Sequence, residues 1–449
     1  MSAFGPERAV ALGGPAWLRQ RRSDAADELA VMPMPSEKEE LWRYTPIEEL
    51  HLDDYAPRPS PGSDPASDEA DRALGAAYVQ GLAADLPARA ALVATIDGRP
   101  VSVERSALLG PVRVGGLDVL GTEEGVLGGV LAGGDALVRL NDAFHPDVVV
   151  VDVPEHAVLD APIVIVHWCT AGLSTQGSGD GAQTDARAPA CFPRTVVRLG
   201  AGSSAQVVEV VAGAPGAGRG LVVPITELSA GDGAQLSYAA LQVLGTEVWH
   251  VSRLAAVAGR DATLRTFTVG LGGAYDRSRT DALADGPGSR TELRSAYLGT
   301  GSQVHDVRTL QDHAAPRTTS DLLCKGAVAQ RSRSVYSGLI RVRRGAVRTN
   351  AFQTNHNLVL DEGAHADSVP NLDIEENDVR CSHASTVGPV DEDQRYYLES
   401  RGIPPSRAEQ LIVLGFFDDI VQRSPVPALV GRLRREVVRR LAAVSSEDG

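Results

Sequence analysis

The chain has 449 residues, of which 43% are hydrophobic and 4% are aromatic, and its formal net charge at pH 7 is −15. Its length allows a large core, and its negative charge disfavours nucleic acid and anionic membrane surfaces as partners. No apolar run approaches the roughly 18 residues that span a bilayer, and the N-terminus lacks the charged-then-apolar order of a secretory signal. We therefore expect a soluble, cytoplasmic protein. Lysine occurs only as Lys38 and Lys325, and neither follows a glycine-rich loop, so the chain is not itself a P-loop ATPase.

Composition divides the first third of the chain into three segments: an N-terminal helical region at 1–55, a linker at 56–71 and a mixed α/β connecting segment at 72–137. Ser36 and Glu39 have the Ser-x-x-Glu spacing of a helix capping box. The linker is rich in Pro, Ser and Asp. A short helix is expected near residues 71–82, with strands from about Ala90.

Residues 138–389 alternate short runs of Val, Leu and Ile with Gly, Ala and Asp, which is typical of strands separated by turns. A glycine-centred unit recurs, with Gly202, Gly231 and Gly259 at equivalent positions roughly 29 residues apart. Such a repeat predicts a β-solenoid, in which each turn buries its inner face on its neighbours. A large β-sandwich with similar hairpins is the alternative. The polar, low-complexity stretch at 170–190 is expected to be a disordered loop within this core.

Residues 390–449 return to a helical pattern and predict a C-terminal helical domain. Gly402 and Pro404 end a first helix, and Ser406 with Glu409 forms a second capping-box pattern. The last helix is rich in Arg, which indicates either a solvated face or a docking surface for an acidic partner.

Two neighbouring side chains have the chemistry of metal ligands. Cys381 and His383 are two residues apart in an extended segment, so they share one face of a strand. Thiolate and imidazole both bind iron, although a buried cysteine beside a hydrogen-bonded histidine is the commoner outcome of such spacing. The other cysteines, Cys169, Cys191 and Cys324, are too far apart in sequence to indicate a structural zinc site or a self-contained cluster site.

Two segments near the C-terminus carry a specific resemblance. They read NDVRCSHAS, within Arg348–Gly388, and ESRGIPPSRAEQLIVLGFFDD, shortly after it. Both closely resemble the SufB/SufD family, the scaffold subunits of the SUF machine for iron–sulfur cluster assembly. The segment KEELWRYTPIEEL, at 38–50, resembles the start of SufD-type members. SufB-type members carry a cysteine in the strand that corresponds to FQTNHNLVL, where this chain has Asn355 and His356, so the resemblance is to the SufD-type branch.

The resemblance implies a mainly β protein with a right-handed parallel β-helix (solenoid) core, flanked by N-terminal and C-terminal helical domains. It also implies a non-catalytic scaffold subunit that pairs with a SufB-like subunit and binds a SufC-like ABC ATPase. ATPase motion would then be coupled to the SufB–SufD interface, where a transient iron–sulfur cluster is shared with SufB. A homodimer is the alternative assembly when the chain is alone. Reduced FAD is associated with the family complex, but no segment here has a flavin motif.

For individual residues, the resemblance assigns His383 to the cluster-assembly interface, as a transient ligand of iron or of the nascent cluster, with Cys381 as a weaker second. It assigns SufC docking to five residues of the C-terminal helices: Arg401, Gly402, Leu411, Gly415 and Phe416. Packing of a helical cap against the solenoid is the alternative role of those five.

Two other functions remain as alternatives. One is a SufB-like scaffold that assembles a cluster as a homodimer, against which the absent cysteine argues. The other is a solenoid carbohydrate-active enzyme, against which the low aromatic content and the missing secretion signal argue.

Overall fold

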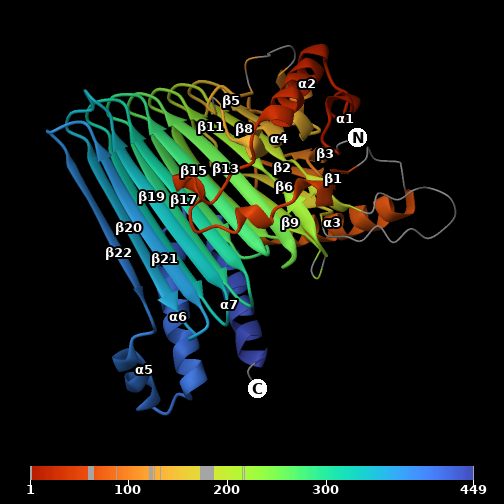
Figure 1. The fold of residues 1–449 in the computed structure, drawn as a ribbon. Helices are drawn as coiled ribbons and strands as arrows, with labels where there is room; N and C mark the ends of the chain where they lie inside the picture. Colours follow the sequence, from red (N-terminus) through yellow and green to blue (C-terminus); the bar gives the residue numbers. More distant parts are fainter. Residues whose placement is uncertain are drawn as a thin grey trace.

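The fold is a parallel β-solenoid of about 7 turns with helices at both ends of the chain (Figure 1). The computed structural model describes residues 3–58, 65–86, 88–120, 125, 127–131, 133–171, 187–214, 216 and 218–447. Two sheets, which we name sheet A and sheet B, form the two walls of the solenoid. The mainly β solenoid predicted from the sequence is therefore confirmed.

Within the described residues, sheet A contains twelve strands. Nine of them follow one another across the sheet: β4 (Arg113–Gly115), β5 (Val149–Val153), β8 (Arg194–Leu199), β11 (Ile225–Ala230), β13 (Val248–Ala258), β15 (Tyr275–Ala284), β17 (Val304–His313), β19 (Arg333–Val342) and β21 (His365–Ile374). Three short strands extend it sideways: β1 (Tyr55–Pro57), β7 (Ala188–Cys191) and β10 (Gly220–Val222).

Sheet B has ten strands within the same described part of the chain: β3 (Arg99–Arg105), β2 (Ala91–Ile96), β6 (Ile163–Cys169), β9 (Ser204–Gly213), β12 (Gln235–Val243), β14 (Thr263–Gly270), β16 (Arg290–Gly299), β18 (Thr319–Val328), β20 (Asn350–Val359) and β22 (Arg380–Gly388). Only the pairs β2–β3 and β4–β5 are antiparallel among these described strands. From β11 onward the chain alternates between the sheets, so each turn of the solenoid adds one strand to each wall.

Period-two patterning explains why these segments stack. Leu236 of β12 lies between Ala205 of β9 and Leu264 of β14, and all three side chains are buried inside the solenoid. Alternate residues of the same strands point outward, where Leu241 and Phe267 are buried in a second cluster with residues of the C-terminal helices. Burial of each of these Leu and Phe side chains contributes about 1.5–3 kcal/mol of transfer free energy. Strands buried on both faces explain the nearly continuous Val, Leu and Ala runs of the sequence.

The predicted alignment of the repeated glycines is correct between the second and third repeats and wrong between the first and second. Gly231 stacks on Gly259, as expected. On its other side, however, Gly231 stacks on Gly200 rather than on Gly202. Gly202 is the neighbour of Gly233, and the two have φ of 65° and 68°, a left-handed conformation that glycine adopts without strain. Both corners have the sequence Gly-x-Gly, so the first glycine of one corner can be aligned with the second glycine of the other. This shifts the predicted register by two residues.

The N-terminal region is only partly α-helical. It contains α1 (Pro6–Ala11) and α2 (Ala16–Val31), followed by 3₁₀ turns at Glu40–Trp42, Ile47–Glu49 and Leu52–Asp54. The backbone N–H of Ser36 donates to Glu39 Oε1 over 3.1 Å, so the capping contact forms. It leads into a 3₁₀ turn instead of an α-helix, because Tyr44 with its φ of 67° and Pro46 interrupt the segment.

The connecting segments differ from the sequence expectations in three places. Helix α3 (Pro65–Asp85) begins inside the range expected to be a linker, because proline fits the first turn of a helix. Helix α4 (Ala136–Phe144), capped by Asp135, occupies the expected start of the β core. Most of the loop expected at 170–190 lies outside the described residues, and its last residues belong to β7. Further 3₁₀ turns lie at Ala107–Leu109, Leu117–Leu120 and Pro427–Leu429.

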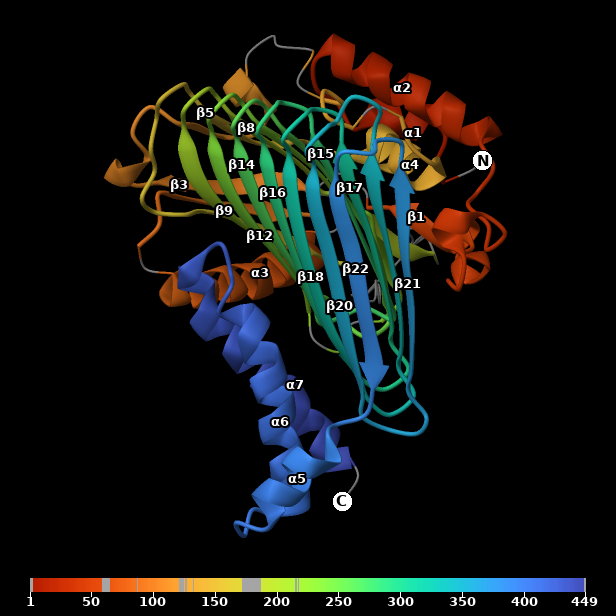
Figure 2. The same ribbon diagram turned by 90° about the vertical axis from the view of Figure 1, so that its left-hand side faces the viewer.

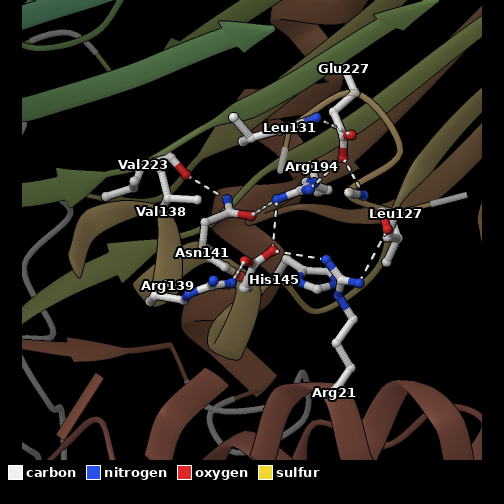
Figure 3. Close-up of polar contacts among 12 residues, drawn as sticks. Arg21, Leu127, Leu131, Val138, Arg139, Asn141, His145, Arg194, Val223 and Glu227 are labelled. Atoms are coloured by element: carbon white, nitrogen blue, oxygen red, sulfur yellow. Dashed lines mark hydrogen bonds and ion pairs between the residues drawn. The ribbon is translucent and has the colours of Figure 1, made fainter. Parts of the chain in front are cut away.

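A buried polar network joins the N-terminal helices to sheet A (Figure 3). Arg194 of β8 pairs with Asp142 of α4 at 3.1 Å and with Glu227 of β11 at 2.5 Å. Arg21 of α2 lies 3.6 Å from the same Asp142 carboxylate. Burial alone would raise the pKa of Glu227, but Arg194 and three backbone N–H donors outweigh it and hold that pKa below its ordinary value. The network therefore fixes α4 on the solenoid by directional contacts.

The C-terminal helices α5 (Glu392–Glu399), α6 (Pro405–Val421) and α7 (Val430–Glu447) lie at the side of the solenoid that sheet B forms (Figure 2). Asp391 caps α5, whereas α6 starts after Pro404 without a side-chain cap, so the second predicted capping box is wrong. Proline at the first helical position of α6 replaces that cap. None of the described helices is long and apolar enough to cross a membrane.

Arginines of α7 form internal ion pairs. Arg432 and Arg435 bond to the Asp85 carboxylate of α3, and Arg434 bonds to Asp418 of α6. These pairs hold α7 against its neighbouring helices. A docking surface for an acidic partner is therefore not favoured for this face.

Candidate functional site

The last strands of the two sheets, β21 and β22, form the end of the solenoid that we call the open end. Among the described strands, β22 pairs only with β20, and β21 pairs only with β19. Each of the two therefore has one edge without a strand partner in this part of the chain. Figure 2 shows β22 at the front, running down toward α5. Unpaired edges are the places where a sheet accepts strands of another chain.

Cys381 and His383 lie in β22 on the face that continues the interior of the solenoid. In register, Cys381 is the neighbour of Ala351, and His383 is the neighbour of Gln353, both of which are buried inside. The predicted placement of the two side chains on one strand face therefore follows from the strand geometry. The next inward residue, Ser385, donates a hydrogen bond of 2.6 Å to Ser368 Oγ of β21, which joins the two walls at the open end.

The two side chains differ in accessibility. Cys381 is half-buried against the apolar cluster of Ala351 and Val379, and burial raises the pKa of its thiol. His383 is exposed. No group of three or more His, Cys, Asp or Glu side chains in the described residues is arranged to hold a metal ion. Two potential ligands at an unpaired edge are too few for a complete iron–sulfur site, so further ligands would have to come from another molecule.

Large apolar side chains are exposed around the same end. Leu372 and Ile374 of β21 are 41% and 40% exposed, and Val387 of β22 is 43% exposed. In the preceding turn, the register neighbours of Leu372 and Ile374 are Ile340 and Val342. Both are buried, because the next turn of the solenoid covers them. The open end thus combines an unpaired edge with apolar surface, which is typical of a protein–protein contact.

The five residues assigned to partner docking lie apart from this end, on α6 and on the turn before it. Arg401, Gly402, Leu411 and Gly415 are exposed, and Leu411 and Gly415 lie one turn apart on the same face of α6. Phe416 is only half-exposed and lies toward the solenoid, where its ring contacts Lys325 of β18. Four of the five are therefore available to a partner, whereas Phe416 also attaches α6 to sheet B.

Sequence reasoning missed a polar site inside the solenoid. Asp276 of β15 accepts hydrogen bonds from His250 at 2.7 Å and from His305 at 3.1 Å, and all three are buried. Burial opposes the charge on Asp276, but the two imidazoles outweigh it and lower its pKa. A cavity of about 60 Å³ is lined by His250, Asp276 and Glu209, and Glu209 forms a second buried pair with His167. Charged residues within strands of buried Val and Leu were the signal that could have found it.

Comparisons with known proteins identify relatives of the chain. Residues 182–416 match the family model described as SUF system FeS cluster assembly, SufBD core domain. An iron-sulfur cluster assembly SufBD family protein of Mycobacterium tuberculosis is 33% identical over 285 residues, which is 62% of this chain and 69% of the relative. The SufD proteins of Bacillus subtilis and Escherichia coli are 32% and 36% identical, over 48% and 36% of this chain and 50% and 38% of their own lengths.

The family model covers the β-solenoid from β7 to β22 together with α5 and most of α6, and it describes a protein of iron–sulfur cluster assembly. The chain belongs to the SufBD family of the SUF system.

Proposed function

We propose that the chain is a SufD-type scaffold subunit that pairs at its open end with a SufB-like subunit. The exposed apolar residues Leu372, Ile374 and Val387 would be buried in that pair, and the free edges of β21 and β22 would meet strands of the partner. The observation that supports this most is His383, an exposed imidazole beside a half-buried thiol, on an edge where the described residues form no group of three potential metal ligands.

The chemistry at this interface follows from the two side chains. A neutral imidazole binds Fe²⁺ through a ring nitrogen, and a cluster shared between subunits would take its remaining ligands from the SufB-like chain. Because burial keeps the Cys381 thiol protonated, His383 is the ligand that this chain presents first. The iron–sulfur cluster is the cargo of the assembly, and it leaves for an acceptor protein.

Helices α5 and α6 are proposed to bind a SufC-like ABC ATPase. Leu411 and Gly415 form an exposed face of α6, and Tyr396 and Tyr397 of α5, the helix that packs on α6, are 74% and 57% exposed. Aromatic anchors next to a shallow apolar face are typical of binding hot spots. Only residues 389–391 separate β22 from α5, so the docking helices continue directly from the strand that carries His383.

Cluster assembly by the reconstituted complex with His383→Ala tests this proposal. We expect the complex to form and hydrolyse ATP while iron and sulfide incorporation is lost, because His383 is exposed and supports no packing. The matched control is His365→Ala, another exposed histidine, which lies on β21, the last strand of the opposite wall, and which should assemble clusters normally. Normal assembly by the His383 variant would contradict the proposed role.

A further inference from the structure

Lys325 attaches α6 to the solenoid at three points. It lies on the outer face of β18, and only 8% of its surface is exposed. It is also one of only two lysines among the 43 Lys and Arg residues of the chain. Its Nζ lies 2.7 Å from Oδ2 of Asp419 and donates to the backbone oxygen of Phe416 over 3.1 Å. The ammonium also lies 4.6 Å from the centroid of the Phe416 ring. A carboxylate, a carbonyl and a π face therefore surround one charge.

The shape of the lysine head group explains why it suits this place. An ammonium is compact and has three donors that point in different directions, so it meets three acceptors around it. A guanidinium is planar and presents its donors as a fork, which suits a single carboxylate. Apolar contacts of α6, such as those of Val413 and Phe417, are non-directional and tolerate sliding, whereas the Lys325 contacts have one geometry.

The contact continues from β18 to the open end. Lys325 is the register neighbour of His356 in β20, which is the neighbour of Thr386 in β22. His356 Nδ1 and Thr386 Oγ1 are hydrogen-bonded at 3.2 Å. Burial and the Lys325 ammonium lower the pKa of His356, so its imidazole is neutral at physiological pH. Polar side chains thus run across the outer face of sheet B from α6 to the strand whose inner face carries His383.

We propose that Lys325 is a positioning residue that transmits a displacement of α6 to β18, β20 and β22. The inference rests on the proposed function, in which an ATPase subunit binds the exposed face of α6. Movement of α6 by that partner pulls Lys325 through Asp419 and the Phe416 carbonyl, and the strand ladder carries the shift to β22. Without Lys325, α6 slides over its apolar contacts and β22 keeps its position.

Maleimide labelling of Cys381 reports on β22. Among the described residues the other three cysteines are buried, so Cys381 is the accessible thiol, and peptide mass spectrometry identifies it directly. The experiment uses the full chain with the SufC-like ATPase, with and without ATP. Lys325→Met keeps the apolar stem, and Asp419 keeps its bond to Arg423 at 2.9 Å, so no unpaired carboxylate is created. Lys38→Met, which changes the other lysine at an exposed position, is the control.

In the wild type and in the Lys38 variant, we expect ATP to change the Cys381 labelling rate. In the Lys325→Met variant, ATPase binding measured by calorimetry should stay within about twofold, while the ATP-dependent change in labelling is lost. Lys325→Arg keeps the charge and should restore part of the change. An undiminished response in Lys325→Met, or loss of ATPase binding by that variant, would overturn the inference. Failure of the wild type to bind the ATPase would instead refute the proposed function on which it rests.

Discussion

The substitution Asp276→Asn removes one negative charge from the interior of the solenoid and leaves the volume of the side chain almost unchanged. The wild-type carboxylate is 3% exposed and accepts one hydrogen bond from His250 and one from His305. Hydrogen bonds to a charged group contribute about 1.5–3 kcal/mol each. The neutral amide has a single oxygen acceptor, so one imidazole loses its partner inside the core. We expect the free energy of unfolding to fall by about 1.5–3 kcal/mol, the contribution of one hydrogen bond to a charged group.

Equilibrium urea unfolding at pH 7, followed by circular dichroism, measures this loss. Asp160→Asn, at an exposed position, is the control and should change stability by less than about 0.5 kcal/mol. The difference between wild type and Asp276→Asn should shrink below about pH 4. Since folding lowers the pKa of Asp276, its stabilisation is complete above the unfolded pKa and is lost as the pH falls toward the folded one. A loss below about 1 kcal/mol at pH 7 would refute the reasoning.

Three further predictions concern other parts of the chain. Burial lowers the pKa of His313 from 6.5 to about 4, so the imidazole resists protonation in the folded state but not in the unfolded state. Acidification from pH 6.5 to 4 should therefore remove on the order of 3 kcal/mol of stability. The variant His313→Gln should show a weaker pH dependence of stability in urea titrations. Gly326→Ala should cost about 1–3 kcal/mol in the same assay, because a Cβ there would collide with the buried Tyr297 ring; unchanged stability would argue against this packing. Gly415→Ala should raise stability by about 0.5–1 kcal/mol, because nothing surrounds its Cβ position within 4 Å; a lower melting temperature would contradict an open helix face.

The solenoid could be predicted because its cause is local and repeated. The recurring glycine corners indicate the length of each solenoid turn, and the runs of Val, Leu and Ala between them indicate that each turn is buried. The register could not be predicted at every corner, since two Gly-x-Gly turns allow either alignment until neighbouring backbones are in place. The predicted start of α6 was also wrong. The helix begins at Pro405, whereas the Ser406 and Glu409 spacing had indicated a cap at Ser406.

The candidate site was partly readable from the sequence. Cys381 and His383 share a strand face because alternation is a property of the strand itself. The incomplete ligand set, by contrast, depends on which strand is last in its sheet, and this is a property of the whole fold. The Asp276 group and the Lys325 contact bring together residues about 30 to 90 positions apart, so the sequence can mark a charged residue within a buried strand but cannot identify its partners.

The composition of the complex tests the central claim most directly. The chain is co-expressed with SufB-like and SufC-like proteins, and the purified assembly is measured by size exclusion with light scattering. We predict one copy of this chain, one SufB-like subunit and two SufC-like subunits. Gly415→Arg, which has room on the exposed face of α6, should lose one SufC-like copy and keep the SufB-like partner. A chain that stays alone or forms only homodimers in the presence of both partners would contradict the account.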